Sequence, residues 1–238
     1  MADEISTETL RFDPFRHVRD REKWLSPRLL SLIRSSDLAG RSCVDVGCGE
    51  GGLTFPASEY VGRILGIDVA EDRIARAKQI LLDRGLENVS FRVADADRAD
   101  YRALVREGRI DGVMANLCMS DPIIDRTSEA LDAGGLLLFC CFEETQWKET
   151  GRKSRYAYSE ERLREVLRRR GFGVGLVRIE REVIEFSTQE EAETYFSVGP
   201  LRTRWERDGR WERLMAYFDS GGRTFTARSQ FIVRAVRL

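Results

Sequence analysis

Short apolar segments alternate with helical ones over the first 142 of the chain's 238 residues, and this alternation constrains the fold more than any other feature. The apolar segments contain few polar positions, as strands do when both faces of a sheet are covered. Strands that alternate with helices predict an α/β fold with a mainly parallel, buried sheet. The expected strands are 42–46, 63–67, 89–93, 110–116 and 136–142, and the expected helices are 71–84, 101–107 and 125–133.

The pattern changes after Phe142. Residues 143–158 are polar and aromatic without a clear period, and residues 187–222 indicate helical segments. Between them we expect a helix that Ser159 caps and a strand over 173–186. A last strand over 223–238 follows the helical segments, so we expect it to be antiparallel. We therefore predict a helical N-terminal cap segment over 1–40 and one domain over 41–238, with insertions at about 143–158 and 187–222.

Charge and composition exclude several classes of protein. With 39 basic and 40 acidic residues the formal net charge is -1, which argues against binding to nucleic acid through bulk charge. The longest apolar run has nine residues, whereas a membrane helix needs about 20. The five cysteines form no CxxC pair and the acidic N-terminus lacks an apolar signal core, so we expect a reduced cytoplasmic protein. The sequence has no cluster with metal-ligand spacing, and we expect no metal.

A glycine-rich loop at residues 47–52 is the most informative segment. It satisfies the GxGxxG dinucleotide fingerprint, which leaves a nicotinamide oxidoreductase as one alternative. However, carboxylates at Asp45 and Glu50 would repel a pyrophosphate. S-Adenosylmethionine has no phosphate and carries a sulfonium and an ammonium cation, so the acidic loop favours this ligand. Asp68, at the end of the second expected strand, is suited to accept both hydroxyls of a ribose.

Five segments in order resemble the successive motifs of the class I S-adenosylmethionine-dependent methyltransferases. They are VDVGCGEGG, GIDVAEDRIARAK, VADAD, ANLCMSD and LDAGGLLLF, and they span about residues 43–142. The resemblance implies a Rossmann-like sheet of seven strands, with helices on both faces and the cofactor at the carboxyl ends of the first strands. The family's insertions, here 143–158 and 187–222, would cover the substrate.

The resemblance also implies individual roles in cofactor binding. Gly47 and Gly49 would line the methionine and ribose portion, with Asp45 near the ammonium group. Asp68 would bind the ribose and Val69 would pack on the adenine. The remaining expected contacts are Asp95 and the Ala96 N–H with the adenine, and Asn116 and Leu117 with the methionine portion and the methyl group.

Each of these residues also has a structural interpretation. Asp45 could hold the turn locally, and Asp68 could cap the following helix. Asp97 and Asp100 lie close to Asp95 in the sequence and could share its role. Asn116 could simply end a strand.

The acceptor is less constrained than the cofactor. Asn116 is followed by Leu-Cys-Met rather than Pro-Pro-aromatic, which resembles the members that methylate small molecules. Residues 143–238 carry 20 basic and 16 acidic groups, which favours a carboxylate or another anionic metabolite as the acceptor.

His17 is a weak candidate for a catalytic base. An RNA or protein acceptor, or cofactor binding without catalysis, are the alternatives. Pocket candidates are Arg152, Arg155, Arg202 and Arg204, with Trp147, Tyr156, Tyr195 and Trp205.

Overall fold

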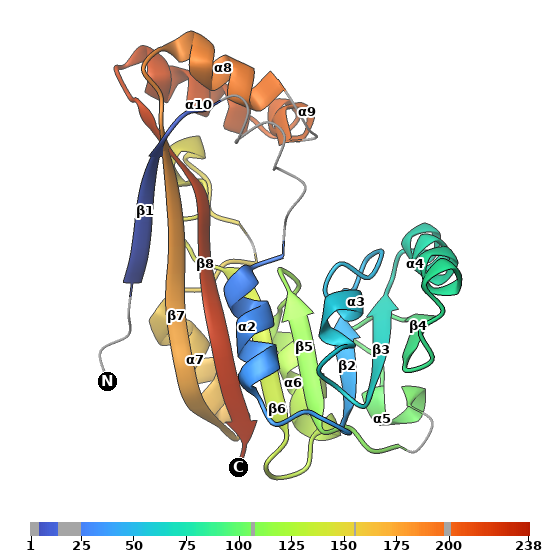
Figure 1. Cartoon of the computed structure of the whole chain (residues 1–238). Helices are drawn as coiled ribbons and strands as arrows, with labels where there is room; N and C mark the ends of the chain where they lie inside the picture. Colours follow the sequence, from blue (N-terminus) through green and yellow to red (C-terminus); the bar gives the residue numbers. More distant parts are fainter. Residues whose placement is uncertain (1–4, 14–24, 106–107, 155, 198–200) are drawn as a thin grey trace. The chain divides into compact units, whose positions relative to one another are not determined.

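A computed structural model describes residues 5–13, 25–105, 108–154, 156–197 and 201–238. Its strands form a sheet in the order β1-β7-β8-β6-β5-β2-β3-β4 (Figure 1). The strands are β1 (Ile5–Arg11), β2 (Ser42–Val46), β3 (Arg63–Asp68), β4 (Val89–Val93), β5 (Gly112–Asn116), β6 (Leu136–Phe142), β7 (Phe172–Glu185) and β8 (Thr224–Arg237). The helices are α2 (Pro27–Ser35), α3 (Thr54–Ala57), α4 (Glu71–Arg84), α5 (Tyr101–Leu104), α6 (Asp121–Ala130), η2 (Lys148–Thr150), α7 (Glu160–Arg169), α8 (Gln189–Ser197), α9 (Leu201–Glu206) and α10 (Arg210–Asp219).

The sheet is mainly parallel. β2 pairs in parallel with β3 and β5, β3 with β4, and β5 with β6. β8 runs antiparallel to β6, because the N–H of Arg237 donates to Gly135 at one end and the N–H of Glu143 donates to Ser229 at the other. The predicted α/β class with an antiparallel last strand is therefore confirmed.

The described part of the chain has eight strands in this sheet, not the seven that the resemblance implies. The additional strand is β1, which pairs in parallel with β7 from Ile5 opposite Ile179 to Arg11 opposite Glu185. Its sequence, ISTETLR, has no continuous apolar run because an edge strand needs none and charged side chains protect it from further pairing. The helical cap segment predicted over 1–40 is therefore wrong for residues 5–11, which pair with β7 as an edge strand.

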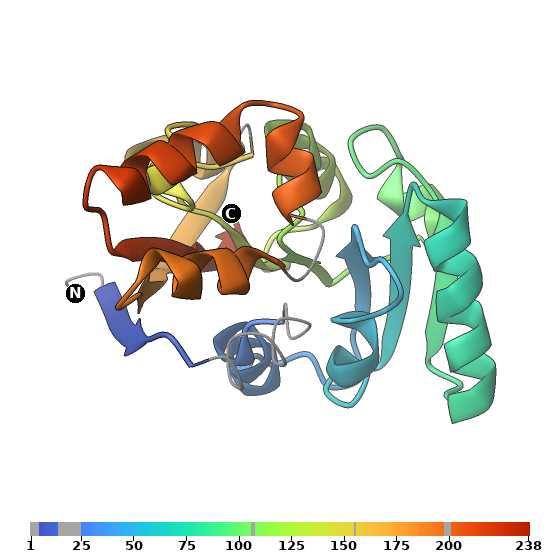
Figure 2. The same cartoon turned by 90° about the horizontal axis from the view of Figure 1, so that it is seen from above.

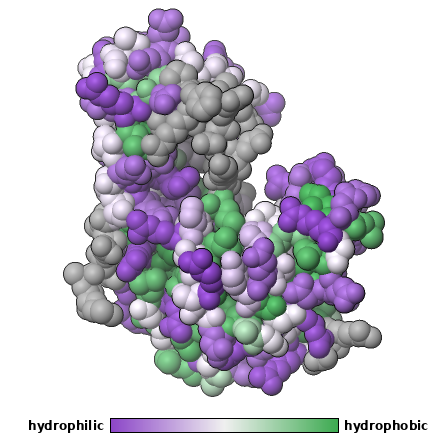
Figure 3. All heavy atoms as spheres, in the orientation of Figure 1, coloured by the Kyte–Doolittle hydropathy of each residue, from purple (hydrophilic) through white to green (hydrophobic). Residues whose placement is uncertain are grey.

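Helices cover both faces of the sheet. α2 and α3 contact each other on one face, and α5, α6 and α7 form a layer on the other (Figures 1 and 2). α4 lies along β4 and β3, and its outward side is mainly hydrophilic (Figure 3). Since both faces are covered, β2, β3 and β6 are buried along nearly their whole length. None of the described helices is long and apolar enough to span a membrane.

The helix ends follow local capping rules. α4 matches the prediction and ends where Gly85 adopts a left-handed conformation with φ of +62°. α6 begins four residues before the expected position, at Asp121 rather than Asp125. The reason is Ser120, whose side chain accepts the N–H of Ile123 at 3.2 Å, followed by Pro122 in the first turn.

The chain divides into two compact units, each with its own hydrophobic core. Unit 2 comprises residues 25–141, 159–177 and 232–238, and its core includes Ile33, Ile64 and Met114. Unit 1 comprises residues 1–24, 142–158 and 178–231, and its core includes Phe186, Phe196 and Trp205. β7 and β8 contribute residues to both units.

Candidate functional site

The glycine loop of unit 2 follows β2 and has two glycines with different surroundings. Gly47 has φ of +68°, and a Cβ atom there would lie 2.2 Å from the Sγ atom of Cys118. Gly49 has φ of +55°, and a Cβ atom there would meet no protein atom within 4 Å. Gly47 is thus required by the loop after β5, whereas Gly49 borders open space that a ligand can approach closely.

Asp68 ends β3 and holds the glycine loop. Its Oδ2 atom accepts the N–H of Gly49 at 2.9 Å, and its Oδ1 atom accepts the N–H of Ala70 at 2.9 Å. The second bond is a local turn contact and not a cap of α4, because the N-cap of that helix is Ala70 and no side chain caps it. Each carboxylate oxygen retains a second lone pair, so these contacts leave Asp68 able to accept hydroxyl groups as well.

Asp45 is 1% exposed, and its Oδ2 atom accepts the hydroxyl of Thr54 at 2.6 Å. Burial raises the pKa of Asp45 to about 7, the Thr54 hydroxyl opposes this shift, and the charge of Asp68 adds to it. Because its pKa is raised, Asp45 carries only part of a negative charge near neutral pH, and a cation bound nearby would favour its ionised form.

The loops after β4 and β5 meet through a side-chain hydrogen bond. The hydroxyl of Ser120 donates to Asp97 at 2.6 Å, and the hydroxyl of Tyr101 donates to the Ala96 carbonyl at 2.6 Å. Asp95 is exposed, and its Oδ1 atom accepts the N–H of Asp97 at 3.0 Å. These contacts fix the loop that carries Asp95 and Ala96.

The residue after β5 has an unusual backbone. Leu117 adopts φ of +59°, which L-residues rarely do, while its N–H donates to Cys140 at 2.8 Å. This conformation turns the chain immediately after Asn116, so that Cys118 packs against Gly47. Burial, together with the charges of Asp45 and Asp68, raises the pKa of the Cys118 thiol to about 12.

The structure therefore brings the predicted cofactor residues to one edge of unit 2. The contacts described above link the loops after β2, β3, β4 and β5 in pairs. Val69 is 69% exposed directly beside Asp68, so it offers the apolar surface that a flat ring system requires. The open space at Gly49, this apolar surface and the paired carboxylates fit a ligand with a ring, a ribose and cationic groups. His17 lies outside the described residues.

Sequence reasoning missed the residues that support this edge. Thr54 and Ser120 are short hydroxyl side chains, which signal only turns and caps until their partners are known. Glu50 forms an ion pair with Arg76 of α4 at 2.6 Å, so the charge of Arg76 offsets the repulsion of a phosphate that the sequence suggested. Among the described residues, no three His, Cys, Asp or Glu side chains are grouped to hold a metal ion.

Three of the four aromatic candidates for a substrate pocket in unit 1 are core residues instead, whereas Tyr156 is 45% exposed. Trp147, Tyr195 and Trp205 are 7%, 6% and 0% exposed, and the rings of Trp147 and Trp205 lie 5.4 Å apart. The interpretation of these three residues as pocket lining is therefore wrong. They pack around Phe196 and Phe225 because a unit with few strands must bury large side chains to form a core.

The arginine candidates of unit 1 lie mainly on solvated surfaces. Arg202 pairs with Glu206 at 2.9 Å along α9, and Arg152 lies 3.9 Å from Asp208. Arg204 is exposed, and Arg155 lies outside the described residues.

Comparison with known proteins identifies the family. The sequence model of a methyltransferase domain family matches residues 38–171, more than half of the chain. Aklanonic acid methyltransferase DauC of Streptomyces sp. (strain C5) is 33% identical over 55% of this chain and 63% of its own length. Nocamycin O-methyltransferase of Saccharothrix syringae is 37% identical over 38% of this chain and 31% of its own length. The chain thus spans less than two thirds of these curated relatives.

The fold also matches solved structures. The crystal structure of the cyclase SpnF superposes with a TM-score of 0.61 at 22% identity, covering 88% of this chain and 80% of that one. At this identity the match concerns the fold alone, and the cyclase shows that this fold is not limited to methyl transfer. Because the family model covers the four loops described above, the chain belongs to the class I S-adenosylmethionine-dependent methyltransferases.

Proposed function

We propose that this protein transfers a methyl group from S-adenosylmethionine to a small-molecule acceptor. The observation that supports this most directly is the edge of unit 2, where Gly49 leaves open space beside the Asp68 carboxylate. The curated relatives named above are methyltransferases. When bound, S-adenosylmethionine would supply a methyl group on a cationic sulfur, which is electrophilic without further activation.

The roles of individual residues are part of this proposal. Asp68 would accept the ribose hydroxyls, and Val69 would cover the adenine. Asp95 and the N–H of Ala96 would bind the adenine edge. The buried Asp45, together with Asp68, would attract the ammonium group. Gly47 and Gly49 would leave room for the methionine portion, which Asn116 and Leu117 would border.

The chain's contribution to the reaction would be positioning and exclusion of water. In-line displacement gains most of its acceleration from holding the acceptor atom near the methyl carbon in a dry site. An amine or carboxylate acceptor needs no protein base, whereas a hydroxyl acceptor usually requires one. His17 stays a weak candidate for that base. We further propose that the protein acts in the cytoplasm, because all five cysteines are free.

A carboxylate or other anionic acceptor is the finer part of the proposal. It is supported by an open cavity of about 510 Å³ in unit 1, which is lined by two basic side chains, Lys148 and Arg213, and by one acidic side chain, Glu149, whose two oxygens are bound to Thr226. Tyr217 and Thr224 line the same cavity, and their hydroxyls, which lie 3.0 Å apart and bond to each other, would add hydrogen bonds to a ligand. Residues 143–158 and 187–222 would thus recognise the acceptor, as expected for the insertions.

The test has two stages. Calorimetry with S-adenosylhomocysteine measures cofactor binding, and absence of binding by the folded protein would refute the proposal. The protein is then incubated with labelled S-adenosylmethionine and separate small-molecule, RNA and protein fractions of a cell extract. Label in a small molecule supports the proposal, and label only in RNA or protein supports that alternative instead. Binding without any transfer favours a non-catalytic role. Lys148→Gln should then raise the KM of an anionic acceptor, with Lys153→Gln as a control.

A further inference from the structure

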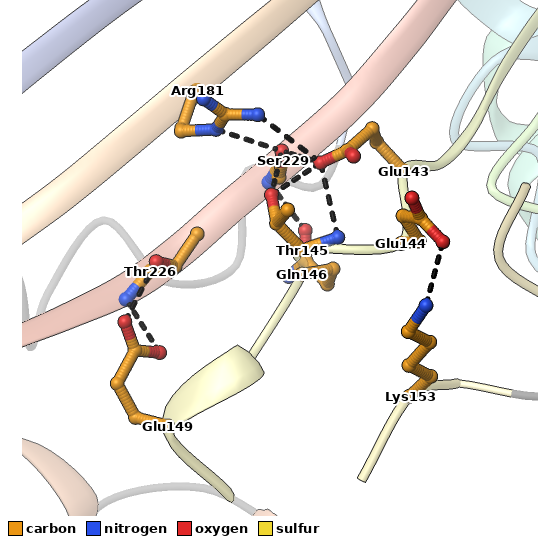
Figure 4. Close-up of polar contacts among 9 residues, drawn as sticks. All are labelled: Glu143, Glu144, Thr145, Gln146, Glu149, Lys153, Arg181, Thr226 and Ser229. Atoms are coloured by element: carbon orange, nitrogen blue, oxygen red, sulfur yellow. Dashed lines mark hydrogen bonds and ion pairs between the residues drawn. The ribbon is translucent and has the colours of Figure 1, made fainter. Parts of the chain in front are cut away.

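Unit 1 contains a buried polar cluster between the segment that follows β6 and strand β8 (Figure 4). Gln146 is 2% exposed, donates to the Ala227 carbonyl at 2.9 Å and accepts the N–H of Ser229. Glu149 binds Thr226 with both carboxylate oxygens, from the N–H at 3.0 Å and from the hydroxyl at 2.8 Å. These bonds fasten the segment to β8 through side chains.

Glu143 belongs to the same cluster but uses only one of its oxygens. Its Oε2 atom accepts the Ser229 hydroxyl at 2.6 Å, the Thr145 N–H at 3.1 Å and the Thr145 hydroxyl. Arg181 adds a fourth contact at 3.3 Å. Figure 4 shows these contacts converging on one end of the carboxylate. No hydrogen bond among the described residues ends on Oε1.

The second oxygen of Glu143 is accessible. The side chain is 8% exposed, and Oε1 is not among the fully buried atoms that lack a partner in the described part of the chain. The residual exposure therefore includes this oxygen. Glu149 provides the contrast, since a carboxylate that serves only to fasten the segment has both oxygens occupied.

We propose that Oε1 of Glu143 binds a hydrogen-bond donor group of a small-molecule ligand, either a hydroxyl or a protonated amine. An ionised carboxylate can only accept hydrogen bonds, so a ligand carboxylate would not be bound at this atom. Charge-assisted bonds of this kind are roughly twice as strong as neutral ones. If unit 1 recognises the methyl acceptor, which rests on the proposed function, the donor group belongs to the acceptor.

The surroundings of Glu143 keep it ionised and oriented. Burial acts to raise its pKa, but the hydrogen bonds from Ser229 and Thr145 and the charge of Arg181 outweigh this effect and lower it. A carboxylate with a lowered pKa is a weak base, so Glu143 binds the donor group rather than removing its proton. Because four contacts fix Oε2, the position of Oε1 is fixed before any ligand arrives.

Three probes with a common ring test the proposal: benzylamine, benzyl alcohol and benzoate. Their affinities for the whole protein are measured by ligand-observed NMR titration, with and without S-adenosylhomocysteine. Glu143→Gln preserves the shape and should weaken binding of benzylamine, of benzyl alcohol or of both at least fivefold. The larger loss identifies the preferred donor. Benzoate affinity should be unchanged.

Two matched variants serve as controls. Glu144→Gln removes the neighbouring carboxylate, which pairs with Lys153 at 2.7 Å, and should change no affinity. Glu160→Gln removes a carboxylate of α7 that pairs with Arg164 at 2.7 Å, and it should likewise change no affinity. The proposal would be overturned if benzylamine and benzyl alcohol each bound folded Glu143→Gln as tightly as they bind the wild-type protein. It would also be overturned if neither of them bound the wild-type protein. If Glu143→Gln does not fold, Arg181→Gln is used instead. This change removes the cation beside Glu143 and should strengthen benzylamine binding, so an unchanged or lower affinity for benzylamine would overturn the proposal.

This experiment separates the two proposals. S-Adenosylhomocysteine binding is measured independently by calorimetry and should be the same for Glu143→Gln and the wild type. A protein that binds the donor probes through Glu143 but not S-adenosylhomocysteine would refute the proposed function and leave the Glu143 site standing. A protein that binds S-adenosylhomocysteine but does not bind the donor probes through Glu143 would refute only the Glu143 site.

Discussion

Asp68 accepts the backbone N–H of Gly49 at 2.9 Å, so the carboxylate that ends β3 also fixes the loop that follows β2. This single contact joins the two segments that the proposed function assigns to the ribose. It also means that the conformation of the glycine loop depends on a side chain 19 residues further along the chain.

Replacing Asp68 should therefore affect both binding and stability. Asp68→Ala should weaken S-adenosylhomocysteine binding by about 1–3 kcal/mol, the usual cost of losing hydrogen bonds to a charged group. It should also lower the melting temperature, because the N–H groups of Gly49 and Ala70 lose their acceptor. Calorimetry and thermal unfolding measure the two effects. Asp72→Ala, on the exposed side of α4, is the control, and an affinity of Asp68→Ala equal to that of the control would refute the ribose assignment.

The two glycines of the loop should respond differently to alanine. At positive φ either substitution costs roughly 1–2 kcal/mol. Gly47→Ala adds a collision with the Cys118 sulfur, for which overpacking costs about 1–3 kcal/mol more. Urea unfolding should rank Gly47→Ala as the less stable variant. Because the Sγ and Cβ atoms of Cys118 would lie 2.2 and 2.5 Å from the added methyl group, Gly47→Ala/Cys118→Gly should recover part of the loss.

For S-adenosylhomocysteine binding, Gly49 should matter more than Gly47. Gly49→Ala places a methyl group in the open space beside Asp68, so its loss of S-adenosylhomocysteine affinity should exceed what its stability explains. If Gly49→Ala binds as tightly as the wild type, this space is not part of the cofactor site.

Asp45 should make the stability of the protein depend on pH in an uncommon direction. Its pKa rises from the ordinary value of 3.8 to about 7, so between these values the folded state binds more protons than the unfolded state. The contribution of Asp45 is thus fully present below pH 3.8 and is lost as the pH rises towards 7.

Asp45→Asn removes this dependence. The free energy of unfolding, measured in urea from pH 4.5 to 7.5, should fall more steeply with pH for the wild type than for Asp45→Asn. Other groups affect both proteins equally, so the difference between the two curves isolates Asp45. Parallel curves would mean that Asp45 is ionised throughout this range.

The sequence predicted most of unit 2 because its elements are locally encoded. Continuous apolar runs mark β2, β3 and β6, and Gly85 marks the end of α4. The residues at the ends of these strands could be predicted for the same reason, since parallel strands present their carboxyl ends at one edge. The sequence could not reveal Thr54 as the partner of Asp45, because that bond depends on tertiary geometry.

Unit 1 was harder to predict because its signals are ambiguous. Trp147 and Trp205 have the amphipathic rings expected of a ligand pocket, but tryptophan is also the largest side chain that a hydrophobic core can bury. β1 is a charged edge strand whose pairing with β7 depends on residues about 170 positions away. Glu143 gave no signal at all, because only its neighbours on β7 and β8 distinguish it from a surface carboxylate.

Two serines at helix N-termini give a test of the link between the loops after β4 and β5. Ser120 caps α6 and Ser159 caps α7, each by accepting a backbone N–H. Loss of either cap should lower the free energy of unfolding by about 0.5–2 kcal/mol. Only Ser120 also donates to Asp97, so only Ser120→Ala should release the loop that carries Asp95 and Ala96.

S-Adenosylhomocysteine affinity separates the two serine variants. Ser120→Ala should weaken binding several-fold, whereas Ser159→Ala should bind like the wild type despite a similar loss of stability. Ser120→Thr retains a hydroxyl at the same position and should restore most of the affinity. If Ser120→Ala and Ser159→Ala bind equally well, the hydrogen bond to Asp97 serves only the fold, and the adenine is held without help from the loop after β5.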